Sequence, residues 1–121
     1  MSAYILLPFP PSVNTLYINV RGRGRATSGK YKDWQHEAAM MLGKQTLPKF
    51  DKRVDLEIEV GPGRANADCS NLIKAVEDTL VKHGILIDDS KNYVRSVKVS
   101  WSTEVVGCSV WIKECDDDVE K

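Results

Sequence analysis

The sequence has no excess of either charge, because 17 basic and 17 acidic residues balance in a chain of 121 residues. A balanced surface argues against strong non-specific binding to nucleic acid, so a nucleic-acid partner has to be inferred from local clusters. Long apolar runs are also missing, and no basic start precedes a hydrophobic segment. We therefore expect neither a membrane span nor a secretion signal.

Histidine and cysteine are scarce as well, which disfavours a zinc site and a histidine-based catalytic triad. The two histidines lie far apart, and the three cysteines (Cys69, Cys108 and Cys115) lack metal-ligand spacing. Cys108 and Cys115 are separated by an odd number of positions in an extended stretch, so their side chains would point to opposite faces. We interpret all three as reduced thiols, which predicts a cytoplasmic protein.

Hydrophobic periodicity predicts two helices and five extended segments. Apolar residues recur at helical spacing between residues 30 and 44 and alternate with charged residues between residues 54 and 60. A second helix is predicted to start near Ser70 or Asn71 and to stop at Gly84. The other extended segments are predicted at residues 5–8, 16–20, 97–101 and 106–112.

These elements follow the order β-β-α-β-α-β-β. Strands bunched around two helices, without regular alternation, predict an α+β fold in which a small mixed sheet carries two helices packed on one face. The length suits a single domain, which we expect over residues 1–115. An acidic tail, predicted to be disordered, follows at residues 116–121.

Carboxylates gather along the second predicted helix and just beyond it. Asp68 stands at the start of this helix, and Lys74 and Asp78 lie one turn apart on its polar side. Asp88 and Asp89 follow the helix stop and a short apolar run that can return beside the helix. Carboxylates that fold into one place repel each other unless a hard cation holds them.

This pattern favours metal-assisted attack on a phosphodiester. Mg²⁺ keeps several waters, so Asp68 with one or both of Asp88 and Asp89 would suffice as protein ligands. The ion would polarise the scissile phosphate and lower the pKa of an attacking water. Lys74 would neutralise the charge that develops on the phosphate or on the leaving oxygen.

Each of these residues also has an ordinary structural interpretation. Asp68 can be a helix cap, and Lys74 with Asp78 can be a solvent-exposed ion pair. The segment at residues 88–90 can be a simple turn. The residues alone leave both interpretations open.

A basic segment lies before the first predicted helix. Its positive charges are interrupted by glycines that let the backbone approach a phosphate, and they come from Arg21, Arg23, Arg25, Lys30 and Lys32. The segment is interpreted either as a DNA-binding loop or as a flexible solvated loop.

The last predicted strand is apolar on both faces, since Trp111 lies opposite Cys108 and Val110. A second apolar face suggests a covered surface, and a dimer contact is one way to cover it. Trp34 and Trp101, in contrast, are predicted to belong to the core.

An ordered set of motifs resembles the RusA family of phage-type Holliday-junction resolvases. The set comprises Asp68-Cys69-Ser70-Asn71-Leu72-Ile73-Lys74-Ala75, then Asp78 and Ile87-Asp88-Asp89, with Leu7-Pro8-Phe9-Pro10-Pro11-Ser12, Asn14, Tyr17 and Arg21-Gly22-Arg23 near the start. The resemblance covers nearly the whole chain. It implies a homodimeric crossover junction endodeoxyribonuclease that uses Mg²⁺ or Mn²⁺ to make paired symmetric nicks in four-way DNA junctions during recombination and repair.

The resemblance also implies roles for single residues. Asp68 and Asp89 would be metal ligands, with Asp88 as a further ligand, and Lys74 would be the catalytic lysine. Supporting residues would be Ser70, Asn71 and Asp78, and DNA contacts would come from Arg21, Arg23, Arg25 and Lys30.

One position departs from the family pattern Asp-x-Asp-Asn, because Ser70 replaces the second aspartate. A neutral hydroxyl is a poor substitute for a carboxylate on Mg²⁺. Ser70 can act through a water, or Asp78 or Asp88 can compensate for the lost charge. The alternatives are a catalytically weakened protein that still binds junction DNA, and a small protein-interaction domain without a DNA role.

Overall fold

The structure, a computed structural model, describes residues 1–22, 24–62 and 68–115. Its strands are β1 (Ser2–Leu7), β2 (Tyr17–Val20), β3 (Gly24–Thr27), β4 (Val54–Gly61), β5 (Val94–Trp101) and β6 (Gly107–Glu114). Its helices are α1 (Gly29–Leu42) and α2 (Ile73–Lys82), with short 3-10 helices η1 (Val13–Thr15) and η2 (Cys69–Leu72). The predicted α+β class and element order are confirmed. The tail at residues 116–121, predicted to be disordered, lies outside the described residues.

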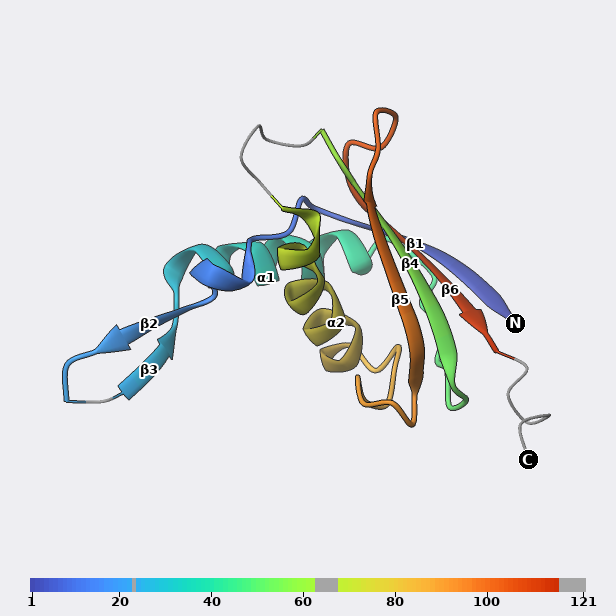
Figure 1. The fold of residues 1–121 in the computed structure, drawn as a ribbon, viewed down its shortest axis with the longest axis horizontal. Helices are drawn as coiled ribbons and strands as arrows, with labels where there is room; N and C mark the ends of the chain where they lie inside the picture. The colour runs from blue at the N-terminus through green and yellow to red at the C-terminus, as the bar shows by residue number, and fades with distance from the viewer. Residues whose placement is uncertain (23, 63–67, 116–121) are drawn as a thin grey trace.

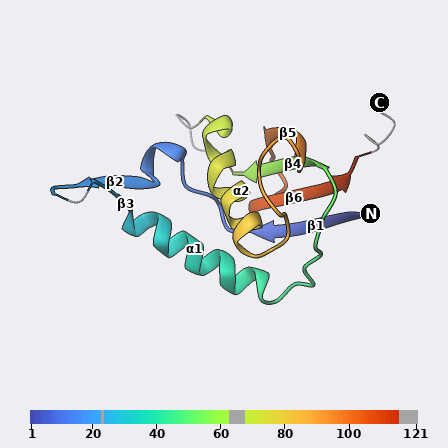
Figure 2. The same ribbon diagram turned by 90° about the horizontal axis from the view of Figure 1, so that it is seen from below.

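The main sheet has the strand order β1-β6-β4-β5. β4 and β5 are parallel, whereas β6 runs antiparallel to both β1 and β4, so the sheet is mixed as predicted. Parallel strands need a long crossover, and α2 lies in the connection between β4 and β5. Both helices cover one face of this sheet, while β2 and β3 form a separate hairpin that extends away from it (Figures 1 and 2).

The core lies between the sheet and the two helices. Strict alternation along β4 buries every second side chain, namely Val54, Leu56, Ile58 and Val60. The helical periodicity of α1 and α2 buries Tyr31, Trp34, Ala38 and Leu42 on the first helix and Ala75, Val76, Thr79 and Leu80 on the second. Gly84 follows α2 with a φ of 74°, which confirms the predicted helix stop. None of the helices in the described ranges is long and apolar enough to span a bilayer.

A side chain covers part of the outer edge of β1. The Gln45 carboxamide, just after α1, accepts a hydrogen bond of 2.9 Å from the Leu6 backbone N–H and donates one of 2.8 Å to the Leu6 carbonyl. It therefore makes both bonds that a neighbouring strand would make at that residue.

Three local predictions were wrong. Residues 24–27 form β3, paired with β2, where a flexible loop was expected, because the register from Tyr17↔Thr27 to Val20↔Gly24 closes a hairpin. Val106, placed in the last strand, is 89% exposed before β6 starts. The second helical segment begins where predicted, with η2 as a 3-10 turn before α2. Trp101, expected in the core, is 39% exposed because it ends the edge strand β5 and stacks on Phe9 instead.

Candidate functional site

Lys74 lies beside two carboxylates, those of Asp78 and Asp89. On α2, the Lys74 ammonium lies 3.1 Å from Asp78 Oδ1, because residues four apart share one side of a helix. The same ammonium lies 3.9 Å from Asp89 Oδ2, in the segment that follows α2. The structure thus brings together three of the predicted site residues.

The position of Asp89 depends on how the chain returns after Gly84. Ile85 and Leu86 are buried, and their backbone N–H groups donate to the Leu80 carbonyl at the end of α2. The Ile85 carbonyl accepts a bond of 2.9 Å from the Phe50 N–H, so the run is fixed from a second side. The predicted apolar return is therefore present for these two residues, and it leads directly to Asp88 and Asp89.

A tyrosine from the other helix also belongs to this group, which we call the Lys74 cluster. Tyr31, on α1, is 2% exposed, and its hydroxyl donates a hydrogen bond of 3.2 Å to Asp78 Oδ2. Asp78 therefore bridges Tyr31 and Lys74 with its two oxygens. The sequence identified Tyr31 only as a core residue of a helix, because its contact with α2 arises from tertiary packing.

The cluster changes the ionisation of its members. The hydrogen bond from Lys74 to Asp78 raises the pKa of the lysine, and the nearby Asp89 charge acts in the same direction. Burial, together with the Asp78 carboxylate, raises the pKa of the Tyr31 phenol far above its usual value. Lys74 is therefore held as a cation and Tyr31 as a neutral hydrogen-bond donor.

Glu77 is a further member that the sequence analysis missed. Burial, with a smaller contribution from Asp89, raises the pKa of its carboxyl group to about 7. The available signal was its spacing of three residues from Lys74, which places both on adjacent turns of α2.

Asp68 has the role of a helix cap in this structure. Its Oδ1 atom accepts hydrogen bonds from the Ser70 backbone N–H at 3.2 Å and from the Ser70 hydroxyl at 3.0 Å, and its carbonyl accepts one from the Asn71 N–H. Ser70, at the position where the resemblance predicts an aspartate, thus contacts Asp68 directly. Both side chains are exposed at the start of η2.

The donor atoms near Lys74 are hard oxygens of the kind that Mg²⁺ and Mn²⁺ prefer. In the described part of the chain, however, no group of three or more His, Cys, Asp or Glu side chains is placed to hold a metal ion. Asp68, Asp88 and Asp89 carry oxygen donors of the kind that these ions bind, and a metal site built from them stays a prediction.

The β2–β3 hairpin stands out from the rest of the molecule (Figures 1 and 2), and its sequence carries basic residues. Arg21 and Arg25 are exposed on it, and Lys30 is exposed at the start of α1. Arg25 places its guanidinium 4.7 Å from the centre of the Tyr17 ring. Arg23, also predicted to contact DNA, lies outside the described residues.

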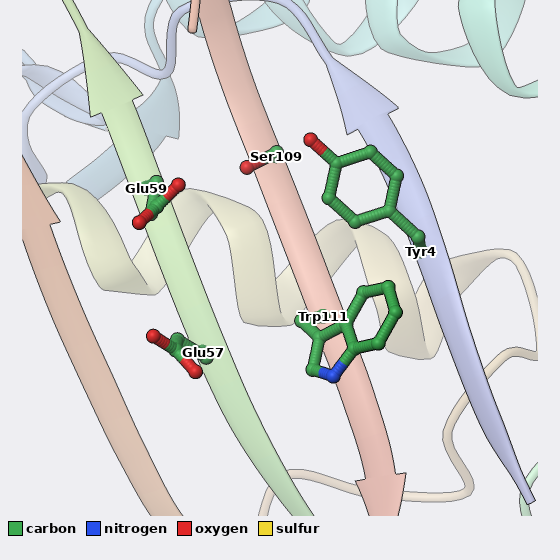
Figure 3. Close-up of a pocket in the computed structure, with 5 residues that line it drawn as sticks. All are labelled: Tyr4, Glu57, Glu59, Ser109 and Trp111. Carbon is green, nitrogen blue, oxygen red and sulfur yellow. The ribbon is translucent and has the colours of Figure 1, made fainter. Parts of the chain in front are cut away.

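A shallow pocket lies on the face of the sheet that the helices leave uncovered (Figure 3). Its lining consists of Tyr4, Glu57, Glu59, Ser109 and Trp111. Tyr4 and Trp111 contact each other edge to face, with ring centroids 5.4 Å apart. As predicted, Trp111 points away from the core, and 45% of it is exposed.

Comparison with known proteins identifies the family. Residues 8–113 match the family model described as endodeoxyribonuclease RusA. A crossover junction endodeoxyribonuclease rusA of Enterobacteria phage 82 is 35% identical over 91 residues, which cover 73% of this chain and 74% of the relative. The protein of the same name from phage HK97 is 30% identical over 101 residues, covering 78% and 82%.

A bacterial relative has the same name. The crossover junction endodeoxyribonuclease RusA of Escherichia coli strain K12 is 32% identical over 95 residues, which cover 75% of this chain and 78% of the relative. The matched residues include the whole Lys74 cluster and the basic hairpin. This chain therefore belongs to the RusA family of endodeoxyribonucleases.

Proposed function

We propose that this endonuclease resolves four-way DNA junctions by paired symmetric nicks, with Mg²⁺ or Mn²⁺ as cofactor, during recombination and repair. The observation that carries the proposal is the placement of Lys74 between Asp78 and Asp89 in a chain of the RusA family. A protein acting on chromosomal or phage DNA would work in the cytoplasm.

In this proposal Asp68 and Asp89 hold the ion, and Asp88 is the third candidate ligand. When bound, the ion polarises the phosphate and lowers the pKa of the attacking water. Lys74 directs its ammonium at the phosphate, where negative charge develops, and its raised pKa keeps it protonated at neutral pH. Arg21, Arg23, Arg25 and Lys30 bind the DNA backbone, which positions the junction.

We also propose that the active form is a homodimer. Two symmetric nicks require two copies of the cleavage site related by a two-fold axis, and a closed dimer supplies them. The uncovered sheet face exposes Tyr4, Leu6 and Trp111, so it is one surface that a partner can cover. Light scattering of the purified protein, with and without a junction, tests the stoichiometry.

A second candidate is a junction-binding protein without cleavage. Ser70 favours it, because the family aspartate is missing and the Ser70 hydroxyl is bonded to Asp68. In that case the basic hairpin retains its role and the metal has none.

The discriminating experiment uses the full chain with a labelled synthetic four-way junction and a linear duplex of the same sequence. The nuclease proposal predicts symmetric nicks in the junction only, dependent on Mg²⁺ or Mn²⁺ and abolished by a chelator. Asp89→Asn should remove cleavage, whereas Asp51→Asn, at an exposed position with no role in the site, should not. Binding that a chelator leaves unchanged, with intact DNA under every condition, would support the second candidate.

A further inference from the structure

A continuous series of contacts joins α1 to the segment after α2. Tyr31 donates to Asp78 at 3.2 Å, Asp78 contacts Lys74 at 3.1 Å, and Lys74 lies 3.9 Å from Asp89. The four residues come from three separate parts of the chain.

We propose that Tyr31 and Asp78 are positioning residues that hold Lys74 beside Asp89, and that the ring contact between Tyr17 and Tyr31 links this arrangement to the basic β2–β3 hairpin. The inference rests on the proposed nuclease function, because it assigns roles within the same site. It concerns the placement of the lysine, and neither Tyr31 nor Asp78 is required to touch the DNA.

Lys74 needs such support because its side chain is long and 45% exposed. A free lysine samples many rotamers, and restricting it costs conformational entropy. Asp78 restricts the ammonium, but a carboxylate on a helix surface can rotate away from its partner. The Tyr31 hydroxyl occupies the second oxygen of Asp78 and thereby fixes the orientation of the carboxylate.

Tyr31 is itself held rigidly. Its ring stacks on Trp34 with centroids 6.2 Å apart, and Trp34 Nε1 donates a bond of 3.1 Å to the Pro8 carbonyl. The Tyr31 backbone N–H donates a hydrogen bond of 3.1 Å to Oγ of Ser28, the residue that caps α1. A buried tyrosine with a fixed ring and a fixed backbone is a suitable anchor for a more mobile carboxylate.

The hairpin contacts the same anchor. Tyr17, the first residue of β2, contacts the Tyr31 ring edge to face at a centroid distance of 6.1 Å. The Arg25 guanidinium lies over the Tyr17 ring. Ser28 donates its backbone N–H to the Leu16 carbonyl at 2.9 Å, so the base of the hairpin and the start of α1 move together. DNA that binds Arg25 therefore acts on the element that anchors Tyr31.

The first test measures the single-turnover cleavage rate at saturating junction and, separately, the junction Kd. Asp78→Asn should lower the rate by about a hundredfold and Tyr31→Phe by about tenfold, with Kd changed less than about twofold, because misplacement affects the chemical step. The double variant should be no slower than Asp78→Asn alone, since Tyr31 acts through Asp78. Asp78→Glu, which keeps the charge, should recover part of the rate.

The matched control is Asp51→Asn, at an exposed position outside the site, which should keep the wild-type rate. Thermal unfolding of each variant identifies those whose fold is damaged. Independent, additive losses from Tyr31→Phe and Asp78→Asn, or losses confined to Kd, would overturn the positioning role.

The link to the hairpin is tested with Tyr17→Leu, which keeps the arginines but removes the ring contact with Tyr31 and the contact with the Arg25 guanidinium. The cleavage rate should fall at saturating junction with little change in Kd, whereas Arg25→Ala should mainly raise Kd. A wild-type rate in Tyr17→Leu would show that the hairpin is not connected to the lysine.

A measurement without DNA separates this inference from the nuclease proposal. A hydrogen-bonded ammonium exchanges its protons slowly enough to give a proton–nitrogen NMR signal, which Lys74→Ala would assign. The Lys74 signal should be present in the wild type and lost in Asp78→Asn. If the wild type cuts no junction, the nuclease proposal fails while the NMR result still decides whether Asp78 holds Lys74.

Discussion

Tyr31 near the start of α1 and Asp78 on α2 are 47 positions apart in sequence, yet a hydrogen bond of 3.2 Å joins their side chains. The bond places a buried phenol behind the carboxylate that contacts Lys74. Asp78, and through it Lys74, is therefore supported from the core side, while Lys74 is open to solvent on the other side.

Removing the ammonium of Lys74 should abolish cleavage and spare binding. Lys74→Ala leaves no cation to oppose the charge that forms on the phosphate, so we expect the single-turnover rate to fall by at least about a hundredfold. Lys82→Ala, in the last turn of the same helix, is the matched control and should retain activity. Equal losses from the two variants would argue against a special role for Lys74.

Glu77 should make the protein less stable as the pH rises. Its pKa is about 7 in the folded state against 4.5 ordinarily, so between these values the folded state binds more protons than the unfolded state. The free energy of unfolding should then decrease as pH rises through this window. Burial and the charges of Asp89 and Asp78 raise this pKa, whereas the Lys74 cation opposes them, so the measurement belongs in metal-free buffer.

Urea unfolding of Glu77→Gln across the same pH range checks this expectation. The variant should lose most of the decrease and should be more stable than the wild type at about pH 8, where the wild-type carboxylate is charged. Glu37→Gln, exposed on α1, should follow the wild-type curve.

Gly61→Ala should strongly destabilise the fold. A Cβ atom at this position would lie 2.2 Å from the Ser102 carbonyl oxygen and 2.7 Å from that of Val105, both of them backbone atoms. We expect a loss of more than about 2 kcal/mol in the free energy of unfolding, because backbone cannot move aside cheaply. Gly29→Ala meets no atom within 4 Å and should leave the unfolding midpoint nearly unchanged.

Cys108 should be chemically inert until the protein unfolds. It is fully buried in β6, and burial raises the pKa of its thiol to about 12, so almost no thiolate is available. Alkylation followed by peptide mass spectrometry should find Cys69, which is partly exposed, labelled in the native protein and Cys108 labelled only in denaturant. Labelling of Cys108 at the native rate of Cys69 would show that the sheet opens.

The sequence predicted correctly the features that depend on residues close together in the chain. The alternation along β4, the helix stop at Gly84 and the pair of Lys74 with Asp78 all follow from spacing within one element, and the structure confirms them. Two features of the site depend on contacts between distant segments, and the sequence did not reveal them. Tyr31 meets Asp78 only because α1 packs beside α2, and the pKa of Glu77 depends on its depth below the surface.

The β2–β3 hairpin is a second case in which pairing between segments, and not the local sequence preference, decided the structure. Glycines and arginines between residues 21 and 25 favoured a flexible loop, because both are frequent in loops. The pairing of β3 with β2 prevailed over that local preference. The predicted metal ligands Asp68, Asp88 and Asp89 stay predictions, since what the structure shows directly is the capping role of Asp68.

The bonds between Gln45 and Leu6 also affect how the molecule can associate. An open strand edge invites pairing with a strand of another chain, which leads to uncontrolled polymerisation. The Gln45 carboxamide already satisfies the Leu6 backbone, so a strand from another chain would have to displace it before continuing the ladder there. A single glutamine after α1 thus closes the β1 edge at Leu6 to pairing with a strand of another chain.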